Sequence, residues 1–143
     1  MLKQKVLKDK ALVIQGLYNQ GEFNEALKIS SDLSKNYPNN SYAQNLHGII
    51  SIALNNWKNG KNSFLKAIEI NNTFPEAYNN LGLSEMNLGD LEKALENFLI
   101  AIKLKPNYDN CHNNILKILT FFRSQKNKDN PYVLANNLIS KIK

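Results

Sequence analysis

The sequence predicts an all-α fold: an α-solenoid of about eight helices, arranged as antiparallel hairpins within a single domain. Three observations support this fold class. Apolar residues recur at helical spacing along most of the chain, a pattern of about 34 residues repeats along it, and no segment alternates at period two as a strand would. A single hairpin has too little core to be stable, so we expect each hairpin to stack on its neighbours.

Residues 75–108 show the repeating unit in its clearest form. Gly89 tolerates a positive φ and is therefore suited to end the first helix of this unit, while Asp90 is a good N-cap for the second. Within the pair, Gly82 allows the two helices to approach closely, and Phe98 is expected to fill the space between them. The unit is thus a helical hairpin with a short turn.

Steps of about 34 residues place further copies at residues 7–40 and 41–74, and a degenerate fourth pair at residues 109–143. Gly21 and Pro38 match the turn glycine and the terminating proline of the clearest copy. The fourth pair has a longer loop, and its last helix begins at Pro131, a favoured first helical residue. The predicted helices are Lys3–Asn19, Phe23–Asn36, Ser41–Leu54, Trp57–Ile70, Pro75–Leu88, Leu91–Lys105, Asp109–Ser124 and Pro131–Lys141.

With Gly82, Ala94, Phe98 and Ala101 at these spacings, residues 75–108 resemble a tetratricopeptide repeat. The resemblance extends over all three clear copies and, in degenerate form, over the last pair. It implies a right-handed superhelix in which the first helix of each hairpin lines a concave groove that binds peptides.

Read across the copies, the groove positions implied by the resemblance form an apolar centre flanked by amides. Side-chain amides offer both a donor and an acceptor, which an extended peptide backbone can pair with. The candidate peptide-binding residues are Asn45, Ile49, Asn79, Asn80, Leu83, Met86, Asn113, Asn114 and Lys117.

Two binding modes of the family can be compared with these positions. A clamp for a C-terminal carboxylate is disfavoured, because Glu76 occupies one of its positions and would repel the ligand. An asparagine ladder that pairs with a peptide backbone fits Asn80 and Asn114. The ladder is incomplete, because Leu12 and Leu46 occupy the matching positions of the first two copies.

Composition and charge narrow the class of partner. The net charge of +6 is carried mainly by lysines near the two ends, and Arg123 is the single arginine, so the sequence disfavours a nucleic-acid partner. The longest nearly apolar run, residues 46–54, is too short to span a bilayer. One cysteine excludes an intrachain disulfide, and we expect a reducing, cytoplasmic location.

No catalytic group, cofactor or metal site is expected. Cys111 and His112 are adjacent on a helix and point about 100° apart, which is poor geometry for a nucleophile and its base. Both residues, and His47, fall at packing positions of the repeat. Two histidines and one cysteine are too few for a zinc site. Three carboxylates are expected to be exposed: Glu85, Glu92 and Glu96.

These observations predict a non-catalytic interaction module or scaffold that binds a protein or peptide partner. The alternative is an accessory region of a larger enzyme, of transferase or oxygenase type, whose catalytic domain lies outside this chain. The apolar last helix suggests an assembly surface, covered either by further polypeptide or by a second copy in a homodimer. Its candidate residues are Leu134, Leu138 and Ile142.

Overall fold

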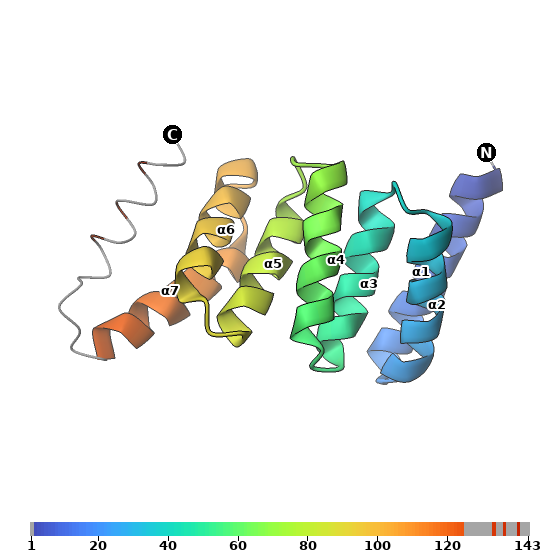
Figure 1. Cartoon of the computed structure of the whole chain (residues 1–143), viewed down its shortest axis with the longest axis horizontal. Helices are drawn as coiled ribbons and strands as arrows, with labels where there is room; N and C mark the ends of the chain where they lie inside the picture. Colours follow the sequence, from blue (N-terminus) through green and yellow to red (C-terminus); the bar gives the residue numbers. More distant parts are fainter. Residues whose placement is uncertain (1, 125–132, 134–135, 137–139, 141–143) are drawn as a thin grey trace. The chain divides into compact units, whose positions relative to one another are not determined.

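The computed structural model describes residues 2–124, 133, 136 and 140. Within this part of the chain there are seven helices and no strand, which confirms the all-α fold class (Figure 1). The helices are α1 (Leu2–Gln20), α2 (Phe23–Asn36), α3 (Ser41–Ala53), α4 (Trp57–Ile70), α5 (Pro75–Asn87), α6 (Leu91–Leu104) and α7 (Asp109–Ser124). Their predicted ends are correct to within one residue, and the predicted helix at residues 131–141 lies largely outside the described residues.

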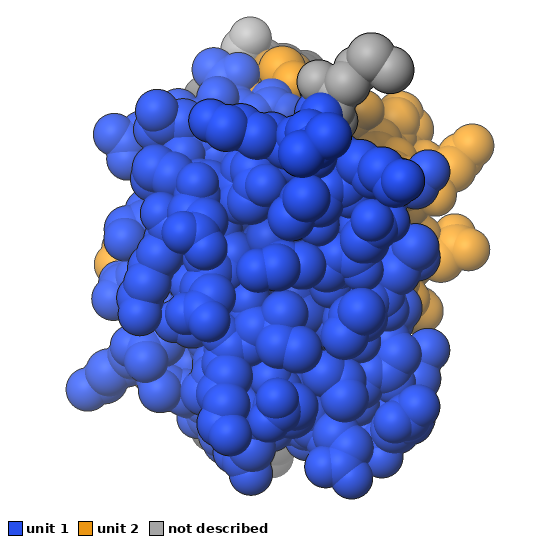
Figure 2. Space-filling model, turned by 90° about the vertical axis from the view of Figure 1, so that its right-hand side faces the viewer, with its two compact units in different colours: residues 1–72 blue, residues 73–143 orange. Residues whose placement is uncertain are grey.

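The chain divides into two compact units, residues 1–72 and residues 73–143, which are distinguished by colour in Figure 2. In the first unit, α1 packs on α2 and α3 packs on α4 as hairpins, and α3 also contacts α2. In the second unit, α5 and α6 form a hairpin and α7 packs on α6. The single domain expected from the sequence remains a prediction.

The three hairpin turns share one backbone feature. Gly21, Asn55 and Gly89 occupy the same position of the repeat, and all three have positive φ angles, of 78°, 59° and 88°. Glycine adopts this conformation without steric cost, and asparagine is among the few other residues that adopt it readily. The second copy therefore makes the same turn without a glycine.

Polar side chains fix the start of three helices. Asn40 accepts a hydrogen bond from the backbone N–H of Ala43 at 2.9 Å, and the N-cap side chain of α4, Asn56, does the same in its own helix. The predicted N-cap Asp90 accepts from the backbone N–H of Lys93 at 3.3 Å. Such caps satisfy N–H groups that have no partner within the helix.

Close helix packing in both units depends on a glycine that faces a phenylalanine. Phe64 and Phe98 are fully buried. A Cβ added at Gly48 would lie 2.5 Å from Phe64 Cε1, and one added at Gly82 would lie 2.8 Å from Phe98 Cε1. The predicted role of Gly82 and Phe98 is confirmed, and the preceding copy repeats it.

Candidate functional site

The second unit brings together most of the predicted groove residues. Asn79, Asn80, Leu83 and Met86 lie on α5, and Asn113, Asn114 and Lys117 lie on α7. The other two candidates, Asn45 and Ile49, belong to α3 of the first unit. The candidate site therefore lies on α5 and α7 of the second unit.

A chain of three amides joins α5 to α7. Asn114 Nδ2 donates to Asn79 Oδ1 at 3.4 Å, and Asn79 Nδ2 donates to Asn80 Oδ1, also at 3.4 Å. Asn79 and Asn114 are only 6% and 8% exposed, whereas Asn80 is half-buried. The amides of Asn79 and Asn114 thus connect the two helices, and this series of hydrogen-bonded amides reaches the surface at Asn80.

An apolar pocket of about 540 Å³ is formed by the C-terminal end of α5, the start of α6 and α7. It is lined by Met86, Gly89, Leu91, Lys117, Ile118 and Phe121. Phe121 is exposed at its edge, and Leu83 is half-buried one turn before Met86. The exposed Lys117 supplies a positive charge to an otherwise apolar lining, so the pocket can accept an apolar side chain and orient a polar group next to it.

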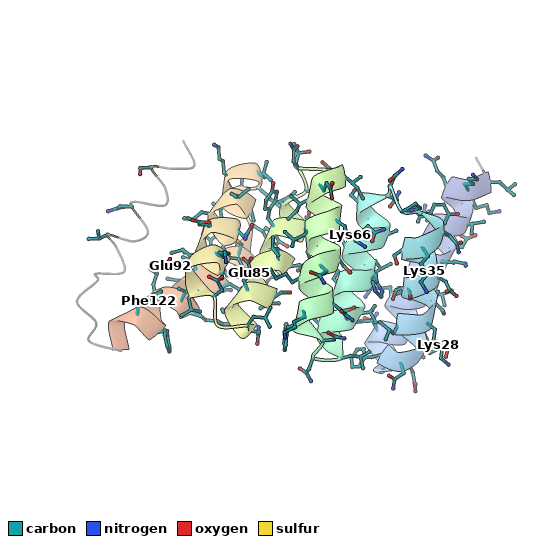
Figure 3. All side chains as sticks on the ribbon, in the orientation of Figure 1. Lys28, Lys35, Lys66, Glu85, Glu92 and Phe122 are labelled. Atoms are coloured by element: carbon teal, nitrogen blue, oxygen red, sulfur yellow. The ribbon has the colours of Figure 1, made fainter. Side chains whose placement is uncertain are left out.

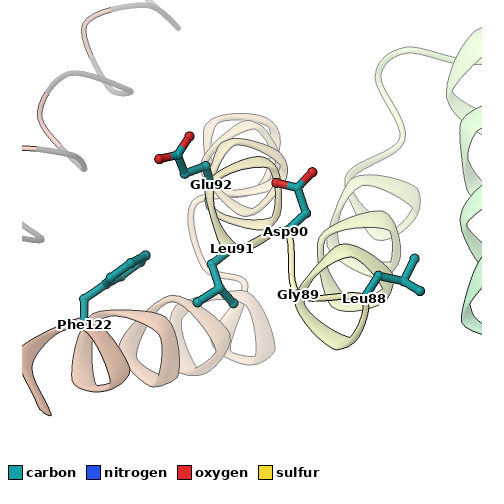
Figure 4. A pocket seen from close by; sticks show the side chains of 6 residues that line it. All are labelled: Leu88, Gly89, Asp90, Leu91, Glu92 and Phe122. Carbon is teal, nitrogen blue, oxygen red and sulfur yellow. The ribbon is translucent and has the colours of Figure 1, made fainter. Parts of the chain in front are cut away.

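Carboxylates border the same region at the turn between α5 and α6. A neighbouring pocket shares Gly89 and Leu91 with the apolar one and is also lined by Asp90, Glu92 and Phe122 (Figure 4). Lys93 Nζ lies 2.6 Å from Asp90 Oδ2, which offsets part of this negative charge. The rim of the apolar pocket therefore carries charges of both signs.

The α3 candidates are less accessible. Asn45 is only 4% exposed, and Ile49 is half-buried. The same unit has a surface pocket of about 400 Å³ formed by α1 and α3, lined by Leu7, Lys8, Ala11, Leu12, Gln15 and Tyr42. Leu12, which interrupts the predicted asparagine ladder, is 64% exposed within this lining.

Sequence reasoning missed Phe121. The repeat register gives the signal that could have found it, because Phe121 occupies the position of Ala53 and Asn87 in the preceding copies. A large aromatic residue at a position that is small or polar elsewhere indicates a local function or a local contact.

One expectation about the carboxylates was wrong. Glu85, labelled in Figure 3, is buried, with 3% of its surface exposed. It accepts a hydrogen bond from Asn97 Nδ2 at 2.8 Å. Ser51, at the matching position of the second copy, is buried too. Glu92 is exposed as predicted, and Glu96 is half-buried.

Cys111 and His112 do not form a reactive pair. Cys111 is buried as predicted, its Sγ donates to the backbone O of Phe98 at 3.1 Å, and burial raises the pKa of its thiol to about 11. His112 was expected at a packing position but is exposed, with Nε2 2.8 Å from the backbone O of Pro106. Its contact is with the end of the preceding hairpin.

His47 is half-buried, and its Nδ1 lies 3.3 Å from Ser30 Oγ. Burial lowers the pKa of its imidazole, and the positive charges of Lys35 and Lys66 lower it further.

In the described part of the chain, no three His, Cys, Asp or Glu side chains gather closely enough to hold a metal ion. No helix among the described residues is long and apolar enough to cross a membrane.

Comparison with known proteins gives both sequence and structural relatives. Residues 75–108 match the family model of the tetratricopeptide repeat. Superkiller complex protein 3 of Mus musculus is 34% identical over 100 residues, which is 65% of this chain and 6% of that protein. Protein O-mannosyl-transferase TMTC3 of Mus musculus is 27% identical over 86 residues, 60% of this chain and 9% of that protein. The chain thus spans a small fraction of the length of these curated relatives.

Among solved structures, the first TPR of Spaghetti (RPAP3) bound to the HSP90 peptide SRMEEVD is similar, with a TM-score of 0.74 and 22% identity. The match covers 80% of this chain and 94% of that one. This likeness shows that the two chains share a fold.

Proposed function

We propose that this chain, which belongs to the tetratricopeptide-repeat family, is a non-catalytic interaction module that binds a peptide segment of a partner protein on the surface shared by α5 and α7. The observation that carries the proposal is the apolar pocket of about 540 Å³ at Met86 and Phe121, on the same two helices as the predicted groove amides Asn80 and Asn113. An apolar anchor and a group that pairs with a backbone are what an extended peptide needs from its receptor.

In this arrangement a large apolar side chain of the peptide enters the pocket between Met86 and Phe121. Asn80 on α5 and the exposed Asn113 on α7 then pair with the peptide backbone outside the pocket. Lys117 selects a peptide with a carboxylate close to the anchor, since it adds a positive charge at the pocket. The proposal therefore predicts an apolar residue followed or preceded by an acidic one.

The comparisons support the class of ligand. The similar RPAP3 domain was solved with a bound peptide of HSP90, which makes a peptide the first ligand to test for this chain. Catalysis is not part of the proposal, because the repeat accounts for α5 and α6, and Cys111 and His112 do not form a reactive pair.

Phage display of a random peptide library tests this function. A selected peptide is then synthesised, and its affinity for the chain is measured by calorimetry. Phe121→Ala should weaken binding by about tenfold or more, equal to about 1.4 kcal/mol. Leu116→Ala is the matched control, because Leu116 is also exposed on α7 but does not line the pocket. If both variants bind like the wild type, or if both lose affinity equally, the peptide surface lies elsewhere.

Two further expectations from the sequence belong to the same proposal. Leu134, Leu138 and Ile142, the predicted homodimer surface, lie outside the described residues. Light scattering coupled to size-exclusion chromatography at several concentrations tests the dimer directly. A cytoplasmic location is the expectation from the single cysteine.

A further inference from the structure

A polar pocket lies in the first unit and shares no residue with the proposed peptide surface. It has a volume of about 470 Å³ and lies where α2, the loop after it, α3 and α4 meet. Its lining includes Ser34, Lys35, Pro38, Gln44, Lys66 and Ile70, with Asn39 and Glu69 at the same pocket. We call it the Lys35–Lys66 pocket.

The two lysines that define the pocket come from different helices, Lys35 from the last turn of α2 and Lys66 from α4 (Figure 3). Both are exposed, and within the described residues neither forms an ion pair. Other lysines do form such pairs, as Lys105 does with Glu76 at 3.0 Å. Both ammonium groups also lower the pKa of the same imidazole, that of His47, so their fields act on one region.

Two backbone carbonyl groups at this pocket already accept hydrogen bonds from a side chain of the protein itself. Gln44 is buried, and its Nε2 donates to the backbone O of Ser34 at 3.0 Å and to that of Pro38 at 3.2 Å. With these two carbonyls occupied, the donors of the lining that face solvent are the two lysine ammonium groups and the side-chain amide of Asn39. Because two of these donors are cationic and the lining holds a single carboxylate, Glu69, the pocket favours a ligand that accepts hydrogen bonds.

Charge and shape together select a carboxylate. Glu69 is the acidic residue in the lining, so the pocket has an excess of one positive charge, which matches a monoanion. The pocket also lies at the C-terminal turns of α2 and α4, where the partial negative charge of the helix ends opposes any anion and opposes a dianion such as phosphate more than a monoanion. Pro38 and Ile70, both exposed, offer apolar contact for a methylene stem.

We propose that the Lys35–Lys66 pocket binds the side-chain carboxylate of a glutamate in a partner protein. It is a second contact surface, distinct from the one on α5 and α7, and it does not depend on that proposal.

The probe is the peptide acetyl-Ala-Glu-Ala-amide, titrated into the whole chain and followed by backbone amide NMR. We expect millimolar binding, with shifts centred on residues 34–38 and 66–70. The double variant Lys35→Gln and Lys66→Gln should weaken binding about tenfold or more. The charge-matched control is Lys28→Gln with Lys58→Gln, which removes exposed lysines from the same two helices outside the pocket and should leave binding unchanged.

His47 supplies a second readout. A bound carboxylate offsets the two lysines, so a saturating amount of the glutamate peptide should raise the pKa of the His47 imidazole, and the Lys35 and Lys66 double variant should raise it without peptide. Three results would overturn the proposal: equal binding of acetyl-Ala-Gln-Ala-amide, equal weakening in both double variants, or tighter binding of inorganic phosphate at the same residues.

Discussion

Replacing Gly82 with Ala tests whether α5 and α6 pack as closely as the structure shows. The added Cβ would lie 2.8 Å from Phe98 Cε1, 2.9 Å from Phe98 Cδ1 and 3.0 Å from the backbone O of Ala94. The phenyl ring is fully buried, and the carbonyl belongs to the backbone of α6. The two helices must therefore move apart to accept the methyl group.

Two opposing effects set the size of the change. Alanine is favoured over glycine inside a helix by about 1 kcal/mol, whereas overpacking a well-filled core costs about 1–3 kcal/mol. Because the obstacles here are a buried ring and a backbone atom, we expect the upper part of that range. Gly82→Ala should thus lower the free energy of unfolding by about 1–2 kcal/mol.

Urea denaturation followed by circular dichroism measures this change, with Gly16→Ala as the control. Gly16 lies inside α1, and a Cβ added there meets no atom within 4 Å. That variant should be more stable than the wild type by about 0.5–1 kcal/mol. Adding Phe98→Leu to Gly82→Ala should recover part of the loss by removing the ring. If Gly82→Ala stabilises the chain as Gly16→Ala does, the packing argument is refuted.

Three further predictions concern single residues. Gly89→Ala should cost about 1–2 kcal/mol because of its positive φ, whereas Asn55→Gly should be neutral or stabilising in the same urea assay. The folded chain lowers the pKa of His47 below 6.5, so its contribution to stability is fully present above that value and is lost as the pH falls. Urea midpoints at about pH 7.5 and about pH 5.5 should therefore differ more in the wild type than in His47→Gln. Burial raises the pKa of Cys111 to about 11, so iodoacetamide should react slowly with the folded chain at about pH 8 and rapidly after unfolding.

The helices and their turns were predictable because their signals are local. Gly89 and Asp90 end one helix and begin the next through their own backbone and side-chain preferences. Residues at the same position of the repeat have similar burial, and the burial of Cys111 was predicted from the matching positions Ala43 and Ala77. Asn55 shows the limit of a search for glycines, since asparagine makes the same turn.

Burial of polar residues was harder to predict, because it depends on partners that are distant in the sequence. Glu85 was judged by its charge, although its repeat position is a buried one. Its partner Asn97 lies on the facing helix, and their pairing at 2.8 Å makes the burial tolerable. Two of the predicted groove amides, Asn79 and Asn114, are buried for the same reason, because they pair with one another across α5 and α7.

This pairing uses two of the predicted groove amides inside the protein. A buried amide without a partner costs about 1–3 kcal/mol, whereas replacing both partners of a hydrogen bond by apolar groups of similar shape costs little. Asn79→Leu alone should therefore destabilise the chain, and adding Asn114→Leu should restore most of the loss. Because this pair is used inside the protein, the double variant should bind a selected peptide as the wild type does, while Asn80→Ala should bind it more weakly. The opposite order of affinities would mean that the buried pair, and not Asn80, recognises the peptide backbone.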